Sequence, residues 1–271
     1  MLLINKSSSI GWTYDQLKES KTAIGFNLIS TLHSILDSWE SNRSGMVTNE
    51  NSQELKNKYK GLVKEAYLAM YHDFHGLAVQ VDMIKHLFVN RKDAVRHKDF
   101  LYVSEIVEKY FANLRSIYDF MAKVLRLSVD QRYLGQINFD SLNSLIESVE
   151  KGKTDGKIPE ILKESLLSIK GEFLRVRGIR DSIIHNGDQI SIMTKDDGYY
   201  LGIWSEDEEK QVYVPLLNFL SERTIEMFKF GEEIGDVIFN EYCDKYGEIP
   251  LTLVALEGVC IPSFINFLGL P

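Results

Sequence analysis

The side chains with the clearest capacity for chemistry lie in one segment, RGIRDSIIHNG, at residues 177–187. Arg180 offers a permanent positive charge and a planar fork of donors that matches phosphate oxygens. His185 titrates near neutral pH, so it can accept or release a proton. One cationic clamp with one acid–base group suffices for transesterification of RNA, because the ribose 2′-hydroxyl is the nucleophile and no metal is needed in principle.

A long helix must position these residues. Pro159 suits its first turn, where the missing N–H has no cost. Asn186 and Gly187 predict its end, because both tolerate the left-handed conformation of a helix terminus. Within a helix, residues five positions apart point about 140° away from each other. Arg180 and His185 therefore share a cleft only through the length of the arginine or a loosened helix end.

The rest of the chain predicts further helices from apolar residues that recur at helical spacing. These helices are expected at residues 13–39, 54–89, 100–127, 139–149 and 215–246. After the motif helix the period changes, and residues 189–193 and 199–204 predict a β-hairpin, with a further strand at 212–214. The expected fold is mainly α: a bundle of five or more helices with a small β-hairpin inserted after the motif helix.

The domain organisation follows from the same pattern. We expect one domain over residues 1–271, with a helical core at 54–246, an N-terminal helix at 13–39 and an apolar C-terminal segment at 251–271. A membrane anchor needs about 20 uninterrupted apolar residues, whereas Glu257, Pro262 and Asn266 interrupt this segment. We expect it to pack on its own domain or on a second copy of the chain, and not in a membrane.

Composition narrows the class of function. The formal net charge is -8, which argues against nonspecific binding to long duplex DNA and requires any nucleic-acid contact to be a local basic site. The two cysteines, Cys243 and Cys260, form no CxxC pair, so a structural zinc site is not expected. Lone thiols are typical of a reducing compartment, and the N-terminal apolar run is too short for a signal peptide. These features predict a cytoplasmic protein.

The motif segment resembles the R-x4-6-H motif of the HEPN superfamily of helical bundles. Arg180 is followed by the polar Asp181, and His185 ends the helix, as in that motif. Residues 114–120 (LRSIYDF) also resemble an earlier helix of such bundles. The resemblance covers residues 54–246.

The resemblance implies a metal-independent endoribonuclease, as in toxin–antitoxin, phage-defence or RNA-processing systems. His185 would act as acid or base, Arg180 would stabilise the phosphate in the transition state, and Asp181 would orient either residue. Arg177 and Asn186 are the candidate substrate-binding residues. The resemblance implies no metal and no cofactor. The expected partners are RNA, a second copy of the chain in a homodimer, and an antitoxin or other partner protein.

Other interpretations remain open. His185 also suits the C-terminal dipole of a helix, and Arg180 can simply pair with carboxylates of the bundle. The alternative function is a non-catalytic helical module for dimerisation, nucleotide binding or partner-protein binding. A second match to the spacing, Arg91 to His97, lies in a charged turn and is interpreted as accidental. His72 and His75 lie on one helix face without an evident third metal ligand.

Overall fold

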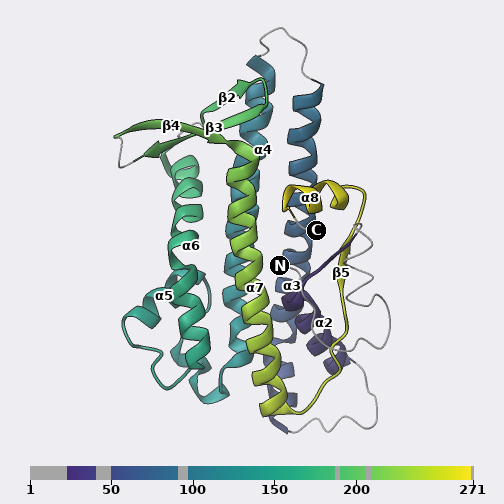
Figure 1. The fold of residues 1–271 in the computed structure, drawn as a ribbon. Helices are drawn as coiled ribbons and strands as arrows, with labels where there is room; N and C mark the ends of the chain where they lie inside the picture. The colour runs from purple at the N-terminus through teal and green to yellow at the C-terminus, as the bar shows by residue number, and fades with distance from the viewer. Residues whose placement is uncertain (1–22, 41–49, 91–96, 187–189, 206–208, 270–271) are drawn as a thin grey trace.

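The computed structural model describes residues 23–40, 50–90, 97–186, 190–205 and 209–269 (Figure 1). Its α-helices are α2 (Asn27–Glu40), α3 (Glu50–Val89), α4 (His97–Val124), α5 (Leu142–Glu150), α6 (Glu160–Asn186), α7 (Leu216–Tyr246) and α8 (Ile261–Phe267). Two 3₁₀ helices, η1 (Leu125–Ser128) and η2 (Gln131–Gln136), follow α4. The strands are β1 (Ala23–Gly25), β2 (Ile192–Lys195), β3 (Gly198–Ser205), β4 (Lys210–Pro215) and β5 (Ala255–Glu257).

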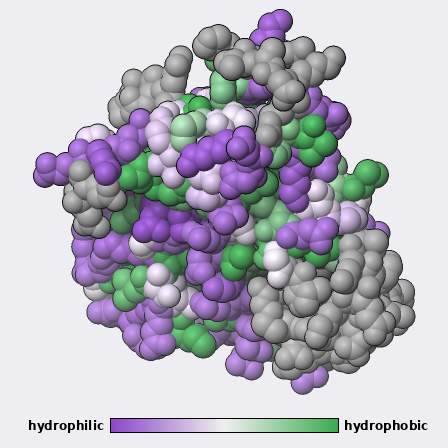
Figure 2. Space-filling view, turned by 45° about the horizontal axis from the view of Figure 1, so that its top comes forward, coloured by the Kyte–Doolittle hydropathy of each residue, from purple (hydrophilic) through white to green (hydrophobic). Residues whose placement is uncertain are grey.

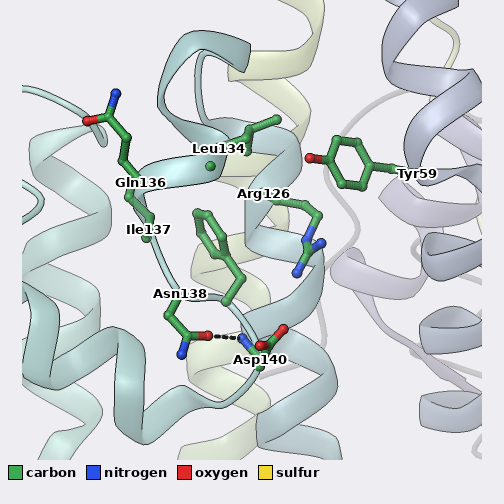
Figure 3. Close-up of a pocket in the computed structure, with 9 residues that line it drawn as sticks. Tyr59, Arg126, Leu134, Gln136, Ile137, Asn138 and Asp140 are labelled. Atoms are coloured by element: carbon green, nitrogen blue, oxygen red, sulfur yellow. Dashed lines mark hydrogen bonds between the residues drawn. The ribbon is translucent and has the colours of Figure 1, made fainter.

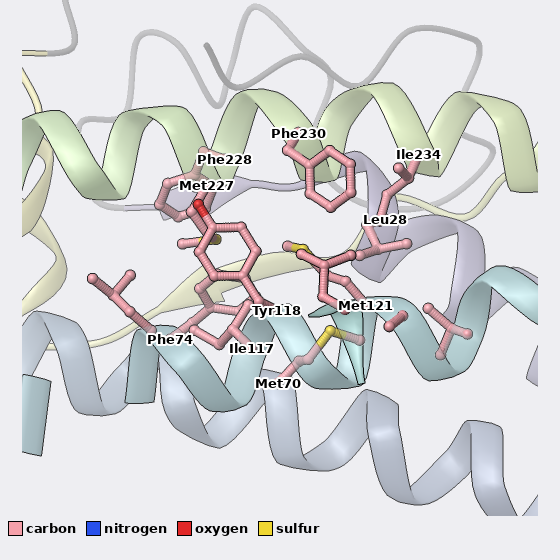
Figure 4. Close-up of a cluster of buried hydrophobic side chains, with 14 of the residues drawn as sticks. Leu28, Met70, Phe74, Ile117, Tyr118, Met121, Met227, Phe228, Phe230 and Ile234 are labelled. Atoms are coloured by element: carbon pink, nitrogen blue, oxygen red, sulfur yellow. The ribbon is translucent and has the colours of Figure 1, made fainter. Parts of the chain in front are cut away.

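The four long helices α3, α4, α6 and α7 lie roughly along one direction and form the body of the molecule (Figure 1). Their apolar stripes meet in one buried cluster, where side chains of α3, α4 and α7 face one another (Figure 4). The stripe of α4 is buried along its length, and its fully buried members include Val103, Tyr110, Leu114, Ile117 and Met121. The prediction of a mainly helical bundle with an inserted hairpin is confirmed.

The small sheet follows the motif helix directly. β2 and β3 form the predicted antiparallel hairpin, with Ile192 opposite Leu201, and β4 adds the predicted third strand. Tyr199 and Leu201 are buried, and the Tyr199 ring packs edge-on against Phe88 of α3 at 5.5 Å between centroids. The sheet therefore lies over the same end of the bundle as the C-terminal end of α6 (Figure 1).

The N-terminal helix begins later than the predicted Thr13. Residues 13–22 lie outside the described residues, and Ala23–Gly25 form strand β1, so the prediction of one continuous helix over 13–39 is wrong. The cause is non-local: β1 pairs antiparallel with β5, placing Ile24 opposite Leu256. The helix then starts at Asn27, whose backbone N–H donates to Glu232 of α7 at 3.0 Å.

The apolar C-terminal segment packs on its own chain, one of the two arrangements expected for it. Leu256, Ile261 and Phe264 are buried. Lys85 of α3 donates to the Ser263 carbonyl at 3.0 Å, and the Thr252 N–H donates to Ser34 of α2 at 2.7 Å. Because Leu256, Ile261 and Phe264 are buried within their own chain, they give no argument for a homodimer. The expectation of a single domain over 1–271 stays a prediction.

The outer surface carries both hydrophilic and hydrophobic residues. Hydrophilic residues predominate on the face drawn in Figure 2, with small hydrophobic patches between them. In the part of the chain that the structure describes, no helix combines the length and the apolar character needed to cross a membrane.

Candidate functional site

The motif occupies the last turns of α6, and the buried face of this helix fixes its position. Phe173 and Val176, in the helical turn that leads to Arg177, are fully buried. The Phe173 ring lies edge-on to Tyr118 of α4 at 5.6 Å and beneath the Arg115 guanidinium at 4.7 Å. Burying a side chain of this size typically stabilises a fold by about 1.5–3 kcal/mol. The motif thus extends from a rigid part of the bundle.

A buried ion pair adds a second anchor between α6 and α7. Arg223 of α7 pairs with Glu172 of α6, and both side chains are about nine-tenths buried. Arg175 adds a longer contact to Glu172 at 3.3 Å. Burial raises the pKa of Glu172 above its ordinary value, although the neighbouring arginines act in the opposite direction. Replacing one partner would leave the other with only a more exposed neighbour, Arg175 for Glu172 or Glu222 for Arg223, so this pair constrains how α6 packs against α7.

Arg177, Arg180 and Asp181 form a hydrogen-bonded cluster on the exposed side of α6. Asp181 Oδ1 accepts from Arg180 Nη1 at 2.9 Å, and Asp181 Oδ2 accepts from Arg177 Nε at 3.1 Å. Arg177 Nη1 also donates to Asn143 Oδ1 of α5 at 2.6 Å. The three charged side chains are each about one-third exposed, at 37% for Arg177, 34% for Arg180 and 33% for Asp181. The cluster is ordered by its own contacts and remains accessible to solvent.

The electrostatics of the cluster leave it positively charged. Partial burial acts to raise the pKa of Asp181, but hydrogen bonds from Arg180 and Arg177 outweigh it and hold the pKa below its ordinary value. Asp181 is therefore ionised at neutral pH. Two guanidinium groups then share one carboxylate, which gives the cluster a net charge of about +1 on a chain of net charge -8. Such a local cation can attract a phosphate that the rest of the surface would repel.

His185 and Asn186 lie in the last turn of α6 by their backbone, and their side chains lie outside the described residues. The α-helix continues to Asn186, so the helix end does not loosen between Arg180 and His185. Positions 180 and 185 consequently lie about 140° apart around the helix axis. Only the reach of the arginine remains as a way to bring both groups to one phosphate within a single chain.

His75, another candidate from the sequence, does not belong to this cluster. Both ring nitrogens of His75 lie beside backbone carbonyls, 3.0 Å from Tyr71 O and 2.9 Å from Glu257 O, so this histidine joins α3 to β5. Among the described residues, no group of three or more His, Cys, Asp or Glu side chains is placed to hold a metal ion. The alternative Arg91 match falls on residues 91–96, which lie outside the described residues, as does the side chain of His97.

Asn143 is a site residue that the sequence did not indicate. It lies in the first turn of α5, where Ser141 caps the helix by accepting from the Ser144 N–H at 3.2 Å. Asp119 of α4 accepts from the Leu142 N–H at 3.1 Å, which fixes the same turn to the bundle. A polar residue at the start of a short helix carries no local signal for a partner 34 positions later in the chain.

Comparison of the chain with protein-family models, curated proteins and solved structures finds no match. The geometry of the cluster and the motif resemblance are therefore the grounds on which a function is proposed.

Proposed function

We propose that the chain is a metal-independent endoribonuclease of HEPN type, with Arg180 and His185 as its catalytic residues. One observation carries the proposal: Arg180 is fixed by Asp181 at 2.9 Å yet stays about one-third exposed. A guanidinium has five N–H donors, and the bond to Asp181 uses one of them. An arginine held in this manner is pre-organised to bind phosphate oxygens without losing further side-chain freedom.

The proposed reaction needs only groups on the RNA and the protein. His185 takes the proton of the ribose 2′-hydroxyl while that oxygen attacks the adjacent phosphorus. The bond from phosphorus to the 5′-oxygen breaks, and that oxygen receives a proton from a second acid. The products are a 2′,3′-cyclic phosphate and a 5′-hydroxyl. Arg180 stabilises the additional negative charge on the phosphorane-like transition state, an effect typically worth about 3 kcal/mol or more.

A homodimer would supply the second histidine that the proposed reaction needs. Because α6 stays helical to Asn186, positions 180 and 185 of the same chain lie about 140° apart around the helix axis. In addition, one histidine cannot be base and acid in the same step. Two motif helices facing each other across a two-fold axis would provide both histidines. The outer face of α6 suits such a contact: Leu167 and Leu174 are 46% and 41% exposed. A Cβ built at Gly171 or Gly178 meets no atom within 4 Å, so a partner can approach the backbone there.

The alternative function is a non-catalytic helical module that dimerises or binds a nucleotide or partner protein. One observation favours it: Asp181 and Asn143 already occupy three donors of the two arginines. Side chains paired in this way also suit a purely structural role. Activity therefore decides between the two functions.

The proposed setting is the cytoplasm, where the enzyme would act as a toxin, a phage-defence factor or an RNA-processing factor. The motif resemblance supports this setting, and an antitoxin or other partner protein would restrain the activity. Neither Cys243 nor Cys260 is part of a disulfide, which suits a reducing compartment.

The proposal is tested by incubating the purified chain with single-stranded RNA in EDTA. Wild type should cleave the RNA and leave 2′,3′-cyclic phosphate ends, and His185→Ala should abolish cleavage. His86→Ala is a matched control, because His86 is an exposed histidine in the last turn of another helix, α3. Absence of cleavage by wild type, as a purified dimer, would leave the non-catalytic module as the better account.

A further inference from the structure

A pocket of about 360 Å³ lies away from the motif, between η2, the segment that follows it and the first turns of α3 (Figure 3). Its walls are residues 134–140 together with Tyr59 of α3 and Arg126 of η1. The volume lies at the lower end of the range for small-molecule sites, about 300–1,000 Å³. The pocket can therefore hold a ligand of a few non-hydrogen atoms up to the size of an amino acid or a small metabolite.

Arg126 is one of the two charged side chains that line this pocket, together with Asp140. Its guanidinium carbon lies 5.3 Å from the centre of the Tyr59 ring and 5.6 Å from the centre of the Phe139 ring. Both rings are buried, with Tyr59 9% and Phe139 3% exposed. Contact of this kind with aromatic faces holds the guanidinium in place, and it becomes stronger as water is excluded.

The fold accounts for only part of the hydrogen-bonding capacity of Arg126. Its Nε donates to the Lys123 carbonyl at 2.7 Å, which satisfies an acceptor at the end of α4. Among the described residues, the ion pairs of the chain do not include one between Arg126 and a carboxylate within 4.0 Å. Burial lowers the pKa of Arg126, while Tyr59 and Asp140 act to raise it. Within the described parts of the chain, the terminal nitrogens of Arg126 make no hydrogen bond, and a half-buried guanidinium of this kind at a pocket wall is a binding group for an anion.

Asp140 supplies the opposite charge at the rim. Figure 3 shows the Arg126 guanidinium directed toward Asp140, with Tyr59 beside it. An Asx-type turn holds this part of the rim, since the Asp140 N–H donates to Asn138 Oδ1 at 2.9 Å. Asp140 is exposed, so its carboxylate keeps its capacity to accept hydrogen bonds from a ligand. The pocket therefore presents one cation and one carboxylate, and its charges sum to zero.

We propose that this pocket binds a small zwitterion of the α-amino acid class, with the ligand carboxylate on Arg126 and the ligand ammonium at Asp140. Charge balance selects this class over a phosphate ester, because a phosphate dianion would face the Asp140 carboxylate. The site is distinct from the motif and does not depend on the proposed ribonuclease activity. The wall segment 134–140 leads through Ser141, the cap of α5, into that helix. Asn143 of α5 accepts a hydrogen bond from Arg177.

The test is isothermal titration of the full chain with each standard L-α-amino acid in turn. At least one should bind. Its analogue without the amino group and its analogue without the carboxyl group should each bind at least about 10-fold more weakly, equivalent to about 1.4 kcal/mol. Inorganic phosphate and adenosine monophosphate serve as competing probes. Tighter binding of either probe would overturn the assignment in favour of a phosphate site, and no binding by any amino acid would overturn it altogether.

Substitutions at Arg126 and Asp140 test whether the amino acid binds in this pocket. Arg126→Gln and Asp140→Asn should each weaken amino-acid binding by at least about 10-fold. Arg132→Gln should leave it unchanged, since Arg132 is a mostly exposed arginine of η2 that pairs with Asp130 at 3.3 Å. If Arg126→Gln fails to fold, Asp140→Asn still decides the matter, because Asp140 is exposed and its turn uses the backbone N–H. Unchanged binding by Asp140→Asn would contradict the zwitterion assignment.

Discussion

Gly235→Ala tests the packing of α2 against α7, on which the N-terminal part of the bundle depends. A Cβ at this position would lie 2.7 Å from the Leu28 backbone nitrogen and 3.0 Å from its Cα. Both atoms belong to the backbone of a helix and cannot rotate away. The Thr31 hydroxyl also donates to the Gly235 carbonyl at 3.4 Å, so the two helices are in direct contact here. We expect α2 to be displaced by the new methyl group.

Two opposing effects determine the size of the change. Overpacking in a well-packed core typically costs about 1–3 kcal/mol. Replacing glycine by alanine inside a helix contributes about 0.5–1 kcal/mol in the other direction. Because the new methyl group meets backbone atoms that cannot move aside, the overpacking cost should lie in the upper part of that range, about 2–3 kcal/mol. The expected net loss is then about 1–2.5 kcal/mol, and in a chain of this size each kcal/mol shifts Tm by about 2–4 °C. Gly235→Ala should therefore lower Tm by about 2–10 °C.

Gly61→Ala is the matched control, because Gly61 lies inside α3 and its Cβ would meet no atom within 4 Å. This variant should raise Tm by about 1–4 °C, since only the helix preference changes. The measurement is thermal unfolding followed by circular dichroism. A gain in Tm for Gly235→Ala comparable with that for Gly61→Ala would refute the close approach of α2 and α7.

Three further predictions concern the cluster and the dimer. Asn143→Ala should lower stability by about 1–2 kcal/mol in denaturant unfolding, because Arg177 loses a charge-assisted hydrogen bond to the Asn143 oxygen and Glu147 loses one from the Asn143 amide. Because the pKa of Asp181 is lowered, its contribution to stability is full above the unfolded value of about 3.9 and is lost as pH falls below it. Asp181→Asn should flatten the stability curve below about pH 4 and leave its shape near pH 7 unchanged. Light scattering at micromolar concentration should give twice the mass of the chain for wild type and a smaller mass for Leu174→Glu, and a monomeric wild type would contradict the dimer.

The helices could be predicted from sequence because their cause is local. Apolar residues at helical spacing, such as Val103, Ile106 and Tyr110, define the buried face of α4 regardless of what covers it. The change of period after the motif helix likewise predicted the hairpin. The start of the N-terminal helix was predicted wrongly, because Ala23–Gly25 become a strand only by pairing with Ala255–Glu257. Nothing within the N-terminal segment signals a partner at the other end of the chain.

The contacts of the candidate site are likewise of two kinds, those set by local spacing and those set by tertiary packing. The proximity of Arg180 and Asp181 follows from adjacent positions, and the Arg177–Asp181 bond follows from i, i+4 spacing on a helix. The contact of Arg177 with Asn143 and the pairing of Arg223 with Glu172 depend on how α5 and α7 pack against α6. The aromatic surroundings of Arg126 depend on α3 meeting the segment after η2. Tertiary packing creates these contacts, so no local pattern predicts them.

The most direct test of the central claim is the single-turnover rate of RNA cleavage in EDTA by Arg180→Lys. Lysine keeps the charge but loses the planar fork of donors, so the rate should fall by about 10²-fold or more. Arg175→Lys is the control, because Arg175 is a 57% exposed arginine of the same helix that contacts Glu172. Its rate should match that of wild type, and both variants should keep the wild-type Tm. Cleavage by Arg180→Lys at the wild-type rate, or no cleavage by wild type, would contradict Arg180 as the phosphate-binding residue of a ribonuclease.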